Sequence, residues 1–130
     1  MTIRFFGSEA EYAFAAVGVG GEAYPRDAAL CRLMQRAGRR PHLRSRTHSG
    51  IYLENGSLLY IDCGHPEYAT AEVTSPAEAC RYIKAGEAIL EELAEEVERA
   101  SDIERVMISR SNVSYVPRAT WACHESIGHR

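Results

Sequence analysis

The stretch SGIYLENGSLLYIDCG, residues 49–64, contains the clearest fold signal in the sequence. An Asn-Gly pair at positions 55–56 stands between two runs of β-forming residues, and this pair favours a hairpin because both residues accept the positive φ of a type I′ turn. With a two-residue turn, Ile51 pairs with Tyr60. The pattern predicts an antiparallel hairpin in which Tyr60 and Asp62 share one face.

A second strand signal follows TIRFF, in the run EAEYAFAAV at residues 9–17. Side chains alternate along a strand, so Glu9 and Glu11 project from one face and Tyr12 and Phe14 from the other. Two carboxylates about 7 Å apart repel each other unless a cation lies between them. This strand therefore predicts either a cation site or a polar face in contact with solvent.

Helical spacing of apolar residues predicts a short helix over residues 25–37 and a long helix over residues 75–100. Ser75 is expected to cap the long helix, with Pro76 in its first turn. The acids of this helix lie mostly outside its apolar stripe and predict a solvated face. Strand character returns in RVMIS, RSNVSYVPR and TWACHES. The fold class is α+β, with a mostly antiparallel sheet, one long helix and one short helix.

The composition favours one domain of 130 residues. A net charge of −3 gives no reason to expect nucleic acid, and no apolar run is long enough for a membrane helix. The basic residues gather in residues 36–46, which predict a solvated loop or a contact with an acidic partner. The four cysteines form no C-x-x-C pair, which is typical of a reduced, cytoplasmic protein.

Acids and histidines recur on the expected sheet elements, a pattern typical of a site for a hard cation such as Mg²⁺. Unrelated surface acids are the alternative. No Walker loop or G-x-G-x-x-G motif is present, so a nucleotide would be held through metal and side chains. The candidates are Glu9, Glu11, Asp62, Glu67, Glu72, His124 and Glu125.

The segments GSEAEYAF, NGSLLYIDCGHPEYATAE, AGEAILEEL and CHES resemble, in this order, the N-terminal part of the family of ligases and depupylases for the prokaryotic ubiquitin-like protein Pup. These are carboxylate–amine ligases related to glutamine synthetase. The resemblance implies the N-terminal portion of a glutamine-synthetase-like fold, with Mg²⁺ and ATP as cofactors. It also implies three sets of residues: the metal site Glu9, Glu11 and Glu67, the nucleotide site Tyr60 and His124, and the catalytic Asp62.

In the ligases of this family, ATP phosphorylates a glutamate side chain of the modifier, and a target lysine attacks the acyl phosphate. Asp62 would deprotonate that amine, whereas in a depupylase or deamidase it would attack or activate water at the amide. The partners implied are a Pup-like modifier and its lysine-bearing targets. The spacing from Asp62 to Glu67 matches the deamidase side, but the distance from Glu11 to Asp62 leaves no room for the depupylase loop, so both reactions stay open.

The family motif H-E-N-Y-L reads HESIGHR here, and the later ATP-binding residues of the family are not in this sequence. We therefore expect residues 1–130 to be one domain, an incomplete N-terminal part of a larger catalytic domain, inactive when isolated. A non-catalytic relative that binds a partner, or forms a homo-oligomer through unpaired sheet edges, is the main alternative. An unrelated small α+β protein is the third.

Overall fold

The computed structural model describes residues 4–40, 45–46, 50–110, 113, 120 and 123–129, with the side chains of 45, 46 and 129 left aside. Much of the expected strand character between residues 111 and 122 lies outside this part of the chain. The described elements are β1 (Arg4–Gly18), α1 (Arg26–Ala37), β2 (Ser45–Arg46), β3 (Gly50–Tyr52), β4 (Leu58–Asp62), β5 (His65–Ala69), α2 (Pro76–Arg99), β6 (Ile103–Arg110) and β7 (Cys123–His129).

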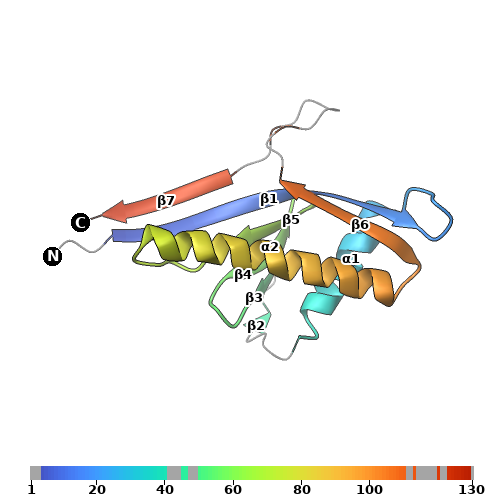
Figure 1. Ribbon diagram of the computed structural model, residues 1–130, viewed down its shortest axis with the longest axis horizontal. Helices are drawn as coiled ribbons and strands as arrows, with labels where there is room; N and C mark the ends of the chain where they lie inside the picture. The colour runs from blue at the N-terminus through green and yellow to red at the C-terminus, as the bar shows by residue number, and fades with distance from the viewer. Residues whose placement is uncertain are drawn as a thin grey trace.

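The described strands form one antiparallel sheet in the order β2-β3-β4-β5-β1-β6, with β7 also paired to β1 (Figure 1). Ala10 pairs with Tyr68 of β5 and with Cys123 of β7, so β5 and β7 flank β1 on opposite sides. Beyond that point β6 pairs with the second half of β1. The α+β class predicted from the sequence is confirmed.

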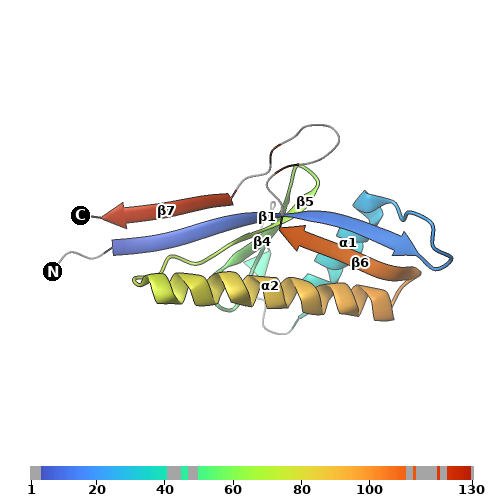
Figure 2. The same ribbon diagram turned by 45° about the horizontal axis from the view of Figure 1, so that its top comes forward.

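The two strand signals at the N-terminus belong to one continuous strand, β1. Gly7 and Ser8 do not interrupt it, because they pair with Ser126 and Glu125 of β7. Its second half extends past β5 and pairs with β6 alone among the described strands. This length lets β1 pair with β5, β6 and β7, and Figure 2 shows β7 running alongside the first half of β1.

The expected register of the first hairpin is wrong by one residue. Tyr60 pairs with Gly50 and not with Ile51, which pairs with Leu59. The turn has three residues, since Leu53 N–H donates to the carbonyl of Ser57 at 2.8 Å. Among the turn residues only Gly56 has a positive φ, of 83°, so a type I′ turn is excluded.

A turn with positive φ at both central residues is found instead in the next hairpin, between β4 and β5. Cys63 has φ of 46° and Gly64 of 84°, and Asp62 pairs with His65 across the turn. Cys63 is the one residue other than glycine with a positive φ in the described part of the chain. The shared face of Tyr60 and Asp62 is nevertheless confirmed, because it depends only on their spacing within β4.

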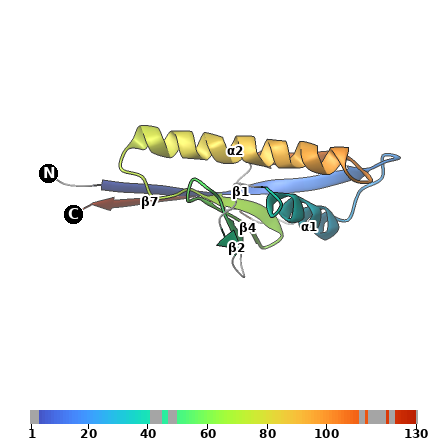
Figure 3. The ribbon, with the colours of Figure 1, turned by 90° about the horizontal axis from the view of Figure 1, so that it is seen from below.

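The long helix α2 runs along β1 and covers one face of the sheet (Figure 3). Its Ser75 cap is confirmed, with the Ser75 hydroxyl accepting the backbone N–H of Glu78 at 3.2 Å. Gly86 lies directly against the ring of Tyr68, which is 1% exposed. The core between α2 and the sheet includes Leu90, Leu93 and Val97 from the helix, and Ala10, Tyr12, Phe14, Leu59 and Tyr68 from the strands.

The short helix α1 packs against α2 and β1. Arg40, just after α1, lies 2.9 Å from a carboxylate oxygen of Glu92 and 2.9 Å from one of Glu96. The predicted solvated acidic face of α2 is confirmed at Glu91, Glu92 and Glu95, which are exposed, whereas Glu96 is partly buried beside Arg40. An arginine of the basic segment 36–46 binds acids of its own chain, which fixes α1 against α2.

Candidate functional site

One face of the sheet, opposite to α2, carries most of the acids predicted for a site. The register places Glu11 beside Glu67, Glu67 beside Tyr60, and Asp62 beside His65. Glu9 pairs with His124 of β7 on the same face. We call this set the acidic face: Glu9, Glu11, Tyr60, Asp62, His65, Glu67 and His124.

Glu11 and Glu67 bring two carboxylates together on neighbouring strands, and both are buried, at 9% and 5% exposed. Directly opposite side chains on paired strands lie within about 5.5 Å at Cβ, and like charges there are destabilising. Burial raises the pKa of Glu67, and the charges of Glu9, Asp62 and Glu11 raise it further. The site thus concentrates negative charge around Glu67, and among the described residues no cationic side chain pairs with the Glu67 carboxylate.

Tyr60 responds to the same charges. Its hydroxyl donates a hydrogen bond to Glu67, which opposes the rise in the pKa of that carboxyl. Burial, this hydrogen bond and the nearby carboxylates raise the pKa of Tyr60 well above its ordinary value. Tyr60 is therefore a neutral hydrogen-bond donor near neutral pH.

Histidines engage the two glutamates of β1. His65 Nδ1 lies 2.7 Å from Glu11 Oε1, with side chains 12% and 9% exposed. His124 Nδ1 lies 3.2 Å from Glu9 Oε2, with side chains 66% and 45% exposed. The first contact is short and enclosed, whereas the second is long and largely in solvent.

Asp62 ends β4 and is exposed beside the turn of Cys63 and Gly64. The charge of Asp62 and a hydrogen bond to its carboxylate raise the pKa of the Cys63 thiol. Asp62 also contributes to the raised pKa of Glu67, so the two carboxyl groups share one electrostatic environment. An exposed carboxylate near buried acids is suited to accept a proton from a group that approaches from solvent.

The structure places on one face of the sheet all six residues that the sequence analysis assigns to the site: Glu9, Glu11, Tyr60, Asp62, Glu67 and His124. Two other candidates behave differently. Glu125 pairs with Ser8 and projects from the opposite face to His124, so it does not join the set. Glu72 lies after β5 and lines a cavity of about 310 Å³ with Glu9.

The sequence analysis predicts no role for His65, although this residue is the histidine of the segment NGSLLYIDCGHPEYATAE. Its signal was the position two residues before Glu67, which places both side chains on one face of β5. That position was readable from the sequence, but the contact with Glu11 depends on the pairing of β5 with β1, a connection across more than 50 residues.

The donor chemistry of the acidic face fits Mg²⁺, because carboxylate and hydroxyl oxygens predominate. Among the described residues, however, no three His, Cys, Asp or Glu side chains are arranged to hold a metal ion. Glu9 and Glu11 each contact a histidine through one carboxylate oxygen, Oε2 of Glu9 and Oε1 of Glu11.

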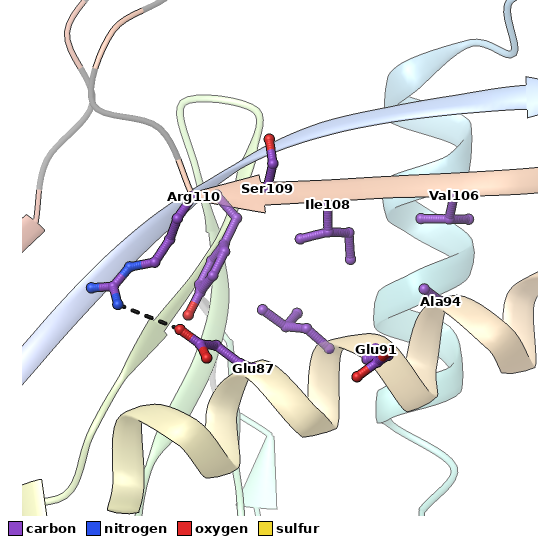
Figure 4. Close-up of a pocket in the computed structure, with 9 residues that line it drawn as sticks. Glu87, Glu91, Ala94, Val106, Ile108, Ser109 and Arg110 are labelled. Carbon is purple, nitrogen blue, oxygen red and sulfur yellow. Dashed lines mark hydrogen bonds and ion pairs between the residues drawn. The ribbon is translucent and has the colours of Figure 1, made fainter. Parts of the chain in front are cut away.

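A cavity of about 400 Å³ lies on the other side of the sheet, between α2 and β6 (Figure 4). Arg110 and Glu87 face each other across it, at 3.4 Å. The buried hydroxyl of Tyr12 borders it and has no hydrogen-bond partner among the described residues, and burial raises the pKa of Tyr12 to about 12. No residue of the acidic face lines this cavity.

The mostly antiparallel sheet with its two helices agrees with the glutamine-synthetase-like fold of a solved ligase, of which the chain covers 25%. The match to known proteins is more specific. The chain belongs to the Pup-ligase family, whose model, described as "Pup-ligase protein", matches residues 4–127.

Among curated relatives, the Pup-protein ligase of Bifidobacterium longum subsp. infantis is 36% identical over 95% of this chain and 25% of its own length. The ligase of Bifidobacterium adolescentis is 40% identical over 74% of this chain and 19% of its own. A depupylase of Acidothermus cellulolyticus is 38% identical over 60% of this chain and 15% of its own. The chain thus spans about a quarter or less of these relatives.

The ligase PafA in a crystal structure with Pup superposes with a TM-score of 0.77 at 30% identity, covering 95% of this chain and 25% of that one. Together these matches confirm the predicted family. In the described part of the chain, neither helix has the length and apolar composition needed to cross a membrane.

Proposed function

We propose that this chain supplies the N-terminal part of a magnesium-ATP site and the catalytic aspartate of an enzyme of the Pup ligase and depupylase family. The observation that carries the proposal is the acidic face, where Glu9, Glu11 and Glu67 lie together beside Tyr60 and Asp62. Burial of mutually repelling carboxylates weakens a fold, so packing alone gives no reason for them.

The proposed roles follow the positions of the side chains. Glu9, Glu11 and Glu67 would hold Mg²⁺, which when bound neutralises phosphate charge and bridges phosphate oxygens to the protein. Tyr60 is a neutral donor toward Glu67 and the nucleotide, and His124 would contact the nucleotide from β7. The cavity of about 310 Å³ beside Glu9 offers space next to these groups.

Asp62 would act on the acyl acceptor. In ligation it accepts the proton of a lysine amine, and in depupylation or deamidation it attacks or activates water at an amide carbon. Its exposure at the end of β4 supports contact with a protein substrate. The ligase of Bifidobacterium longum subsp. infantis matches over 95% of the chain, whereas the depupylase matches over 60% of it, which supports ligation as the first reaction to test.

The proposed partners are a Pup-like modifier and lysine-bearing targets. The ligase PafA matches 95% of this chain, and its crystal structure in complex with Pup supports the first of these partners. A cytoplasmic location and residues 1–130 as one incomplete domain of a larger catalytic unit remain part of this proposal.

Calorimetry with ATP and Mg²⁺ on this chain tests the nucleotide site. Binding should require Mg²⁺ and should weaken at least about tenfold in Glu11→Gln, because a ligand charge is lost while size is kept. Glu125→Gln removes an acid from the opposite face and should bind as the wild type. Equal binding by the two variants, or no binding by the wild type, would overturn the metal-site proposal.

A protein that carries this chain within the complete catalytic domain tests Asp62. Asp62→Asn should abolish modifier transfer or removal while ATP affinity changes by no more than a few-fold, because a base or nucleophile acts in the chemical step. Ligation or amidase activity retained in the Asn variant would remove Asp62 from the mechanism.

The second candidate function is a non-catalytic domain that binds another copy of itself. Among the described strands β7 pairs with β1 alone, and Phe5 and Ile127 nearby are 47% and 62% exposed. Such an edge favours strand pairing between copies. Sedimentation should show dimers that an Ile127→Lys variant loses, and a strict monomer at all concentrations would exclude this function.

A further inference from the structure

His65 lies at the end of the acidic face that borders the turn between β4 and β5. It is the first residue of β5, pairs with Asp62 of β4 in the register, and reaches Glu11 of β1 with its side chain. It therefore lies between the proposed catalytic aspartate and a proposed metal ligand. Its side chain is 12% exposed, so its position is set by the protein around it.

The contact with Glu11 has the geometry of a strong hydrogen bond. The 2.7 Å separation of His65 Nδ1 and Glu11 Oε1 lies at the short end of the range for nitrogen and oxygen, as expected when a carboxylate accepts. Glu67 lies directly opposite Glu11 and repels it, whereas the short contact with His65 holds Oε1 of the Glu11 carboxylate in place.

We propose that His65 is a positioning residue, which donates from Nδ1 to Glu11 Oε1 and so fixes the direction of this carboxylate for a divalent cation. Carboxylates that ligate metals are commonly held by a second hydrogen bond of this kind. The inference rests on the proposed metal site. The corresponding contact of His124 with Glu9 is longer and exposed, so this role belongs to His65 and not to His124.

Nuclear magnetic resonance of the ¹⁵N-labelled chain without metal tests the contact itself. Nδ1 of His65 should carry a proton near neutral pH, and its resonance should shift in Glu11→Gln but not in Glu125→Gln. A neutral ring protonated only at Nε2, or a resonance insensitive to Glu11→Gln, would overturn the proposal whether or not the chain binds metal.

Binding of Mn²⁺, followed by electron paramagnetic resonance, tests the consequence. His65→Phe keeps a ring but removes the donor and should lower Mn²⁺ affinity by about 10- to 100-fold. His65→Asn places an amide N–H near the position of Nδ1 and should restore affinity to within about threefold of the wild type. Circular dichroism on each variant confirms that it is folded.

The two proposals fail in different ways. A wild-type chain that binds no Mn²⁺ at the acidic face contradicts the proposed function, and the resonance experiment then decides the role of His65. A wild-type chain that binds Mn²⁺, with equal binding by His65→Phe, overturns the positioning role and leaves the metal site standing.

Discussion

Tyr12 and Glu11 are neighbours on β1 and are almost equally buried, at 3% and 9% exposed. Tyr12 lies in the apolar core under α2, whereas Glu11 lies among acids on the opposite face. Burial alone therefore does not separate the two faces of this sheet. The difference is chemical. The covered face stabilises the fold by removing apolar surface from water, whereas the acidic face destabilises the fold by bringing like charges together.

This comparison predicts that the two faces respond oppositely to substitution. Changes that remove apolar contacts on the covered face should destabilise the fold and leave ligand binding intact. Changes that remove charge from the proposed metal ligands on the acidic face should have small or stabilising effects on the fold and should weaken ligand binding.

The largest effect is expected for Leu90→Ala on the covered face. Leu90 is 1% exposed within the core, so its truncation should lower the free energy of unfolding by about 2 to 5 kcal/mol. Urea unfolding measures this, with Glu91→Ala on the exposed side of the same helix as the control. A loss no greater than that of the control would show that α2 does not cover this face.

Gly86→Ala should lower the free energy of unfolding by about 1 to 3 kcal/mol through overpacking, although alanine normally stabilises a helix relative to glycine. A Cβ at this position would overlap ring carbons Cδ1 and Cε1 of Tyr68. That ring cannot move freely, because its hydroxyl donates to Ser57 Oγ at 2.8 Å and accepts from Asn55 at 3.2 Å.

The matched control for Gly86→Ala is the reverse change at an exposed position of the same helix. Ala88→Gly should cost about 1 kcal/mol through helix propensity alone. Thermal unfolding of both variants checks the prediction, and a stabilised Gly86→Ala variant would show that α2 lies farther from β5 than described.

Ser75→Ala should cost about 1 kcal/mol, because it leaves the backbone N–H of Glu78 without its side-chain acceptor. The effect should appear in the free energy of unfolding without a change in the acidic face. Ser75→Asp restores an acceptor and should recover most of the loss, and a failure to recover would mean that the cap contributes little.

The smallest effect is expected for Glu67→Gln, and its sign should depend on pH. The pKa of Glu67 is raised in the folded protein, mainly by burial, from an ordinary value of 4.5. The folded state therefore binds this proton more tightly than the unfolded chain, and stability is lost as the pH rises from about 4.5 through the raised pKa.

The variant lacks this loss of stability, so at pH 7 the melting temperature of Glu67→Gln should be higher than that of the wild type. At about pH 3.5 the two melting temperatures should be equal, because glutamate is then protonated in both the folded and the unfolded protein. Differential scanning calorimetry at the two pH values checks this. A variant less stable than the wild type at pH 7 would show that ionised Glu67 stabilises the fold.

The sequence was sufficient for features set by local spacing. The cap at Ser75, the apolar stripe through Leu90, and the shared face of Tyr60 and Asp62 follow from helix and strand periods. The turn after Glu54 could not be derived in the same way, because Asn-Gly also occurs in a three-residue loop with one positive φ. The Asn55 side chain favours that loop by accepting the N–H of Ser57 at 3.0 Å.

The acidic face was predictable only in part. The alternation of Glu9 and Glu11 is visible in β1, but their proximity to Glu67 depends on pairing between strands far apart in the sequence. The resemblance to a family supplied that information. The contacts of Arg40 with Glu92 and Glu96 had no such signal and were missed.

The measurement that tests the contrast between the faces most directly is thermal unfolding with and without saturating Mg²⁺ and ATP. A ligand that binds the folded state raises its stability by RT ln(1 + [L]/Kd). Leu90→Ala should melt well below the wild type but keep the full rise with ligand, whereas Glu11→Gln should melt near the wild type and lose the rise. A ligand-induced rise in Glu11→Gln equal to that of the wild type would contradict the account.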